Sequence, residues 1–212
     1  MNNKSLNNLG INFILPLISA SAVLKKESHL KKLFQSALDN KYDSSKIYEA
    51  LLQTYLFAGF PSALRSIKIF REYFTIENSI EKFDSQKFRF RGELNCKKVY
   101  GKKFEKLISN INSFSPELSE WLIIEGYGKT LGRKKLSMKE REICIVTILT
   151  VLQYEEQLYS HMIGALKTGN SLDEIKESLQ NLRLIGEKRK TEYGLRVLKK
   201  IVSSHIRGSI FN

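Results

Sequence analysis

The stretch SMKEREICIVTILTVLQYEEQLYSHMIGALKTGNSLDEIKESLQNL, residues 137 to 182, decides the fold. Its opening Ser137 and Glu140 form a Ser-x-x-Glu capping box, in which the two side chains bind free backbone N–H groups at the start of a helix. Residues 143 to 152 are apolar nearly all round, which is typical of a buried helix. We therefore predict a helix that begins after Ser137 and lies inside the core.

Two more helices are predicted within the same stretch. The second runs from about residue 155 to 167 and ends at Gly169, because glycine readily adopts the left-handed conformation that terminates helices. Ser171 and Glu174 form another capping box. The apolar residues that follow share one face of a third helix, namely Leu172, Ile175, Leu179 and Leu182.

A similar pattern occurs earlier in the chain at a constant offset of 128 residues. SALDNKYDSSKIYEALLQ, residues 36 to 53, aligns with GALKTGNSLDEIKESLQN, residues 164 to 181. The offset places Ile14 and Leu33 opposite Glu142 and His161. We therefore predict two repeated helical units, of which only the second has a polar pair.

The repeat leads to a prediction of domain organisation. A degenerate first repeat spans 14–75, a connecting helical segment spans 76–136, and the second repeat, with the candidate site, spans 137–203. The two units would bury their apolar stripes against each other, so we expect residues 1–212 to form a single all-α domain.

Composition agrees with a folded helical protein and limits its partners. Hydrophobic residues make up 42% of the 212 residues and charged residues 27%, and only three prolines are present. The net charge is +13, but the lysine pairs are scattered along the chain, and no stacking aromatics accompany them. We expect a solvated lysine-rich surface that attracts small anions, and we do not expect nucleic-acid binding. Two cysteines are too few for a disulfide framework or a metal site.

The amino-terminal run LGINFILPLISASA, residues 9 to 22, permits two interpretations. It could be the apolar core of a signal peptide, although Asn12 and Pro16 interrupt it and only Lys4 precedes it. The repeat instead makes it the first core helix of the first unit, which is the interpretation that we adopt. Since no run reaches the roughly 20 apolar residues of a membrane span, we expect a cytoplasmic protein without a membrane partner.

Residues 117 to 179 resemble the carboxymuconolactone decarboxylase family, which shares its helical fold with the alkyl hydroperoxidase D proteins. Two further segments resemble family motifs, RGELNCKKVYGKKFEKL (91 to 107) and the Ala-Gly-x-Pro helix YLFAGFPSALRSIKIF (55 to 70). Matching positions include Trp121, Gly126 to Lys129, Leu136, Arg141, Glu142, His161, Ala165, Gly169, Glu174 and Ile175. The resemblance implies an AhpD-like helical bundle that assembles into homo-oligomers, as trimers or hexamers.

The same resemblance directs attention to chemistry. The hydroperoxidase branch places a Cys-x-x-Cys pair between its glutamate and its histidine, and Tyr154 and Gln157 occupy those two positions here. Thiol catalysis needs a reactive thiolate, so peroxidase (peroxiredoxin) activity of the usual kind is disfavoured. The decarboxylase branch lacks the pair as well, and its chemistry fits better.

We therefore predict a cofactor-independent lyase or proton-transfer enzyme that acts on a small anionic substrate. His161 is the candidate proton carrier, since its ordinary pKa is near neutrality, and Glu142 would orient it. The candidate substrate-binding residues are Arg141, Lys129, Arg133 and Tyr154. No metal or cofactor is called for.

Two alternatives to the lyase remain open. One is an antioxidant oxidoreductase of the hydroperoxidase type, in which Cys96 or Cys144 would have to replace the missing cysteine pair. The other is a catalytically silent helical scaffold, because a lone histidine on a helix is more often structural than catalytic.

Overall fold

The computed structural model describes residues 9–75 and 80–206, with side chains to residue 203. All the secondary structure in these residues is helical. The predicted all-α class is therefore confirmed. The first half contains α2 (Ile11–Val23), α3 (Glu27–Asp39), α4 (Ser44–Leu52) and α5 (Tyr55–Phe70). The middle contains α6 (Ser85–Tyr100), a 3-10 turn (Gly101–Lys103), α7 (Phe104–Asn112), α8 (Pro116–Trp121) and a π-helix, η2 (Leu122–Thr130). The last part contains α9 (Met138–Leu152), α10 (Glu155–Lys167), α11 (Leu172–Asn181), a 3-10 turn (Leu182–Ile185) and α12 (Lys188–Ile206).

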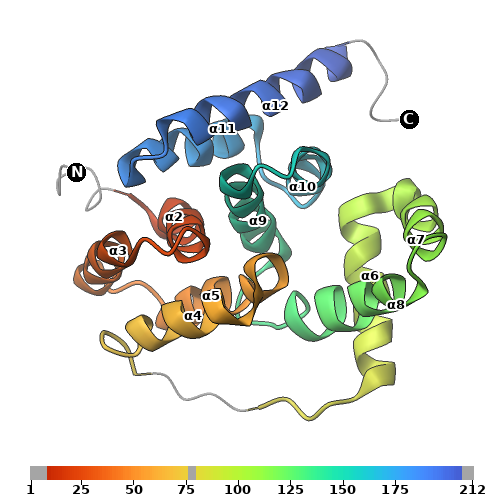
Figure 1. Cartoon of the computed structure of the whole chain (residues 1–212), viewed down its shortest axis with the longest axis horizontal. Coiled ribbons are helices and arrows are strands. Elements are labelled where there is room, and N and C mark those ends of the chain that lie inside the picture. Colours follow the sequence, from red (N-terminus) through yellow and green to blue (C-terminus); the bar gives the residue numbers. More distant parts are fainter. Residues whose placement is uncertain (1–8, 76–79, 207–212) are drawn as a thin grey trace.

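The core is built around α9, at the centre of the bundle (Figure 1). Every residue of α9 from 141 to 151 is buried, as its uniform apolar character predicts. α2 packs along one side of it and α10 along another, while α11 and α12 also contact it. Thr147 on α9 donates a hydrogen bond of 3.0 Å from Oγ1 to the carbonyl of Pro16 on α2, which ties the two central helices together.

The helix ends predicted within residues 137 to 182 are present in the structure. Both capping boxes are formed, at Ser137 with Glu140 and at Ser171 with Glu174. α10 spans Glu155–Lys167, and Gly169 follows it with a φ of +100°. These ends depend on side chains within a few residues of one another, so the sequence alone specifies them.

The helix bounds of the two halves agree with the 128-residue offset. Moved by that offset, α3 (Glu27–Asp39) covers the same positions as α10 (Glu155–Lys167), and α4 begins where α11 begins. The agreement is consistent with the predicted repeat, and the shared origin of the halves stays a prediction. The start of the proposed 76–136 segment, residues 76–79, lies outside the described residues.

The amino-terminal apolar run forms α2, whose residues from Ile14 to Val23 are all buried. It is therefore a core helix, in the place that the repeat predicts. Lys4, which entered the signal-peptide interpretation, lies outside the described residues. In the part of the chain described, no helix combines the length and the apolar character needed to cross a membrane.

Two glycines allow α6 to approach the π-helix η2. A Cβ atom at Gly92 would stand 2.1 Å from the carbonyl oxygen of Ile123, and one at Gly128 would stand 2.1 Å from that of Phe88. Neither distance is compatible with a side chain. The glycine-rich GYGK sequence therefore serves helix packing here, and this close contact fixes the position of α6 beside α10.

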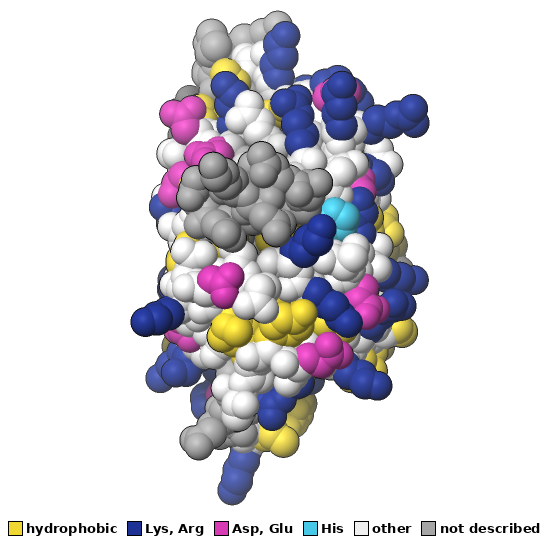
Figure 2. All heavy atoms as spheres, turned by 90° about the vertical axis from the view of Figure 1, so that its left-hand side faces the viewer, with side chains coloured by type: hydrophobic (Ala, Val, Ile, Leu, Met, Phe, Trp, Pro, Cys, Tyr) yellow, Lys and Arg dark blue, Asp and Glu magenta, His cyan; other side chains and the backbone are white. Residues whose placement is uncertain are grey.

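Charged side chains are intermixed on the surface. On the face shown in Figure 2, Lys and Arg side chains are spread among acidic and apolar ones. Several lysines are in ion pairs, including Lys26 with Glu187 and Lys31 with Glu27. The absence of nucleic-acid binding stays a prediction.

Candidate functional site

The structure brings Glu142 and His161 together at the contact between α9 and α10. Glu142 Oε2 lies 2.9 Å from His161 Nδ1, and both residues are buried, Glu142 completely and His161 with 8% of its surface exposed. A carboxylate can only accept, so Nδ1 carries the proton of this hydrogen bond. That arrangement leaves Nε2 as the ring atom that can exchange a proton with another molecule.

Helix periodicity explains why His161 faces α9. It belongs to the stripe of α10 that contacts the core, together with Leu158, Met162 and Ala165, all of which are buried. Gly164 lies one turn further along the same helix. A Cβ atom there would be 2.8 Å from Glu142 Oε2 and 2.6 Å from Val99 Cγ1, so the missing side chain makes room for the carboxylate.

Aromatic rings and a thiol surround the pair. The rings of Phe57 on α5 and Tyr100 on α6 each stand edge-on to His161, with centroids 6.3 Å away. Tyr127 OH donates to Tyr100 OH over 3.5 Å, and Cys96 lies one turn before Tyr100 on α6. None of these four residues is among those that the sequence predicts at the site. The i, i+4 spacing of Cys96 and Tyr100 within the family-like segment 91–107 was the available signal.

Burial determines the ionisation of these neighbours. It raises the pKa of Cys96 to about 12, and the nearby Glu142 carboxylate contributes in the same direction. Burial also raises the pKa of Tyr100 and of Tyr127. The thiol and both phenols are therefore protonated at neutral pH, and each can act as a hydrogen-bond donor.

The second oxygen of the carboxylate has no hydrogen-bond partner. Glu142 Oε1 is buried, and no donor in the described part of the chain reaches it. A buried carboxylate oxygen without a partner carries a desolvation cost that a structural role alone does not require.

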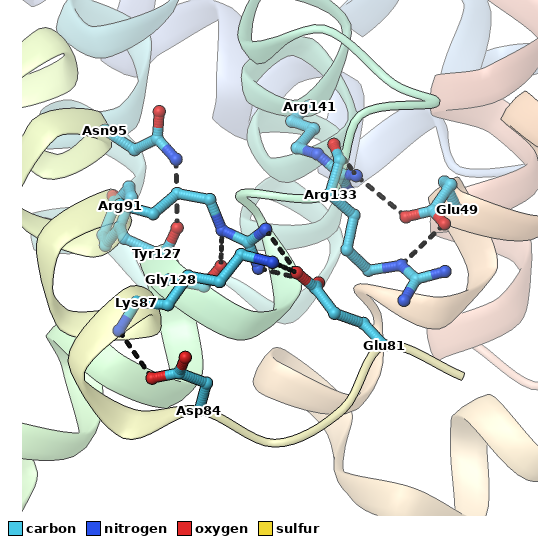
Figure 3. A network of polar contacts seen from close by, with 10 residues as sticks. All are labelled: Glu49, Glu81, Asp84, Lys87, Arg91, Asn95, Tyr127, Gly128, Arg133 and Arg141. Atoms are coloured by element: carbon cyan, nitrogen blue, oxygen red, sulfur yellow. Dashed lines mark hydrogen bonds and ion pairs between the residues drawn. The ribbon is translucent and has the colours of Figure 1, made fainter. Parts of the chain in front are cut away.

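Two of the predicted anion-binding residues have partners elsewhere. Arg141 is completely buried and donates from Nη2 to Glu49 Oε2 over 2.8 Å, while Arg133 Nε donates to Glu49 Oε1 over 2.7 Å. Figure 3 shows both guanidinium groups converging on Glu49 of α4. Arg141 also donates to Gln53 and to the carbonyl of Arg133. The expectation that Arg141 is available to a substrate carboxylate does not fit this geometry, because Glu49 occupies its guanidinium.

The other predicted contacts are at the surface. Lys129 pairs with Glu125 one turn away, at 2.9 Å. Tyr154 is 55% exposed at the start of α10, and Gln157, at the second cysteine position of the hydroperoxidase pattern, is exposed too. None of the four predicted substrate-binding residues makes a hydrogen bond or ion pair with Glu142 or His161 in the described chain.

The residues at the site do not form a metal centre. Among the described residues, no group of three or more histidine, cysteine, aspartate or glutamate side chains is arranged to hold a metal ion. Both cysteines are free thiols. Burial raises the pKa of Cys144 to about 12, as it does for Cys96.

Two curated proteins are similar to this chain. Peroxisomal protein 2 of Schizosaccharomyces pombe is 28% identical over 148 residues, which cover 66% of this chain and 67% of that protein. The 4-carboxymuconolactone decarboxylase of Acinetobacter baylyi is 22% identical over 101 residues, which cover 48% of this chain and 75% of that enzyme. The link to the decarboxylase family is distant. No family model matches the chain.

Proposed function

We propose that the protein is a carboxymuconolactone decarboxylase-like enzyme that moves a proton through His161 without a cofactor. The observation that carries the proposal is the buried hydrogen bond between Glu142 Oε2 and His161 Nδ1. The similarity to a 4-carboxymuconolactone decarboxylase supports it at the level of the family. The reaction class is a lyase reaction or a related proton transfer.

Each residue of the pair has a distinct role in this proposal. Glu142 accepts the hydrogen bond from Nδ1 and orients the ring, so that Nε2 can exchange a proton with the substrate. In a decarboxylation, the bond to the departing carboxylate breaks, and its electron pair moves into a conjugated carbonyl. CO2 leaves as that bond breaks, and the carbon that carried it is then protonated. His161 supplies that proton, and the buried phenol of Tyr100, which accepts a hydrogen bond from Tyr127, is a donor suited to the developing negative charge.

An anionic substrate remains part of the proposal, but its anchor changes. Arg141 and Arg133 are paired with Glu49, and Lys129 is paired with Glu125. The support for an anion is the net charge of +13, which attracts negative solutes to the surface. Within the site, neutral donors would bind the substrate oxygens.

The test follows the ultraviolet absorbance of carboxymuconolactone in the presence of native protein and of His161→Ala. We expect the native protein to accelerate the decay and the variant to lose at least about a hundredfold of that rate, the scale of general acid–base catalysis. His29→Ala is the matched control, because His29 lies on α3 and should leave the rate unchanged. No acceleration by any of the three proteins would remove this substrate, and equal acceleration by all three would remove His161 from the mechanism.

Thiol chemistry is the second candidate function, because a cysteine lies near the Glu142 and His161 pair. Cys96 lies close enough to Glu142 for the carboxylate to affect its pKa. The direction of that effect is unfavourable, because a thiol with a pKa of about 12 is not a nucleophile at neutral pH. Titration of free thiols before and after peroxide treatment separates the two functions, since a peroxidase must oxidise Cys96 or Cys144 reversibly.

The third alternative is a silent scaffold, in which His161→Ala changes no measurable property except stability. Assembly into a trimer or hexamer and a cytoplasmic location also remain proposals. Large apolar side chains exposed on the monomer are compatible with self-association, among them Phe60, Phe83, Phe90 and Trp121. Light scattering after size-exclusion chromatography measures the assembly directly.

A further inference from the structure

A pocket of about 340 Å³ lies at the start of α9, away from the Glu142 and His161 pair. Glu140 and Ile143 of α9 line it. Because successive helix residues turn by about 100°, Glu142 points to the opposite side of the helix from Glu140. The pocket is therefore a separate site.

Helices from both halves of the chain enclose this pocket. Phe13 and Leu15 of α2 and Ile143 of α9 give it an apolar wall, and Ser178 of α11 lies beside them. Leu15, Ile143 and Ser178 are at most 5% exposed. Its volume is near the lower end of the roughly 300–1,000 Å³ that ligand pockets occupy, which suits a molecule about the size of one ring.

Ser178 is the unexplained group of this pocket. It is 1% exposed, and its Oγ has no hydrogen-bond partner in the described chain. Serine hydroxyls inside helices usually bind a backbone carbonyl of the preceding turn, and this one does not. A rotation about χ1 is enough to direct the hydroxyl toward a group that enters from the pocket.

The charges at the pocket are already balanced. Lys139 Nζ lies 2.8 Å from Glu174 Oε1, and Lys46 is paired with Glu140. Both carboxylates also hold capping boxes, with Glu140 accepting from Ser137 N and Glu174 from Ser171 N. Neither carboxylate can move away without weakening the start of a helix, because each completes a capping box. The rim of the pocket therefore has no unpaired charge that would attract a charged ligand.

We propose that this pocket binds a small uncharged molecule, mainly apolar, with one hydroxyl or carbonyl group that hydrogen-bonds to Ser178 Oγ. The apolar wall stabilises the body of the molecule, and the polar group satisfies the serine. Because the pocket joins both halves of the chain, binding also stabilises the fold.

The test is a titration of the full-length protein with phenol and with toluene, which has a similar ring but no hydroxyl. Two-dimensional NMR of the backbone amides of Leu15, Ile143 and Ser178 gives the affinity. We expect phenol to bind more tightly than toluene, and Ser178→Ala to weaken phenol binding roughly fivefold to tenfold without affecting toluene, as loss of one neutral hydrogen bond predicts.

Ser21→Ala is the matched control. Ser21 is a completely buried serine of α2, and its Oγ also has no partner among the described residues, but it does not line the pocket. Both alanine variants should melt at a higher temperature than the native protein, because each removes an unsatisfied buried hydroxyl. Only Ser178→Ala should lose phenol affinity.

Two outcomes would overturn the proposal. In one, phenol leaves the three amide signals unmoved. In the other, Ser178→Ala binds phenol as tightly as the native protein and Ser21→Ala do. Neither result depends on catalysis by His161, so this experiment and the absorbance test above succeed or fail independently.

Discussion

At the scale of single residues, Arg141 places a charged side chain inside the protein core. Its side chain is completely buried, and that burial lowers its pKa while Glu49 raises it. A guanidinium in such a place is stable only with a buried counter-charge. Glu49, which is 2% exposed and lies between Arg141 and Arg133, provides that charge.

Glu49→Gln is therefore expected to destabilise the protein severely. The substitution keeps the shape of the side chain but leaves Arg141 buried without a counter-charge, which costs about 3–5 kcal/mol. Urea denaturation measures the loss. Glu155→Gln is the control, because its exposed pair with Lys200 should contribute less than about 1 kcal/mol. Equal effects of the two variants would show that Arg141 is not ionised inside the core.

Gly164 is expected to be essential for the geometry of the candidate site. An alanine methyl group would meet Glu142 Oε2 at 2.8 Å and Val99 Cγ1 at 2.6 Å. We expect Gly164→Ala to cost about 1–3 kcal/mol, as overpacking of a core does, and to shift the NMR signals of the His161 ring. Gly126→Ala, whose added methyl group would lie 3.9 Å from Leu122 Cδ1 and from the carbonyl oxygen of Trp121, should do neither.

Between elements, the contact of α6 with the π-helix η2 depends on backbone approach and not on side chains. Gly92 and Gly128 each face a carbonyl oxygen of the opposite segment. α6 carries Cys96 and Tyr100, and η2 carries Tyr127. The spacing of these two elements therefore sets the distance between the rings of Tyr100 and Tyr127.

Gly128→Ala is expected to separate α6 from η2. The added methyl group would stand 2.1 Å from the carbonyl oxygen of Phe88, and backbone cannot move aside as a flexible side chain can. We expect a loss of at least about 2 kcal/mol by urea denaturation, and increased solvent exposure of Tyr100. Gly126→Ala is again the control. A Gly128→Ala protein with native stability would show that the two segments are not in close contact.

Features that depend only on residues close together in the chain could be predicted from the sequence. The ends of α10 follow from Gly169 and from the turn that precedes Glu155, so they could be predicted. The π-helix could not, because it depends on its contact with α6. The sequence predicts Arg141 as a substrate anchor and does not reveal its pairing with Glu49, which is 92 positions away in the chain. Cys96 and Tyr100 reach His161 only through the packing of α6 on α10, which no local pattern specifies.

At the scale of the whole molecule, a group of ion pairs to Glu81 holds the segment that precedes α6 in place. Arg91 donates to both oxygens of Glu81 at 3.1 Å and to the carbonyl of Gly128 at 2.7 Å (Figure 3). Lys87 Nζ lies 2.8 Å from Glu81 as well. These contacts link the segment before α6 to the π-helix, and so stabilise the middle part of the chain.

The contribution of Glu81 to stability should depend on pH. Arg91 and Lys87 lower the pKa of its carboxyl from 4.5 to about 2. The ionised form is favoured in the folded state, so its contribution is complete above pH 4.5 and is lost as the pH falls toward 2. We expect Glu81→Gln to be less stable than native protein at pH 6. Half of that difference should be gone at about pH 3.3, because stability changes linearly with pH between the two pKa values.

Denaturant titrations of both proteins between pH 6 and pH 3 measure this change. A difference that stays constant over the range would contradict the ion pairing of Glu81. Glu155→Gln again serves as the control, since its exposed pair should show little dependence on acid in the same window.

The enclosure of α9 determines how the protein loses its structure. Amide hydrogens of a helix surrounded by α2, α10, α11 and α12 can exchange with deuterium only when those neighbours separate. α7, in which Phe104 alone is buried, can exchange through local opening. Deuterium uptake should therefore reach α9 last. Since α9 also carries Glu142, the candidate site lies on the helix that we expect to open last.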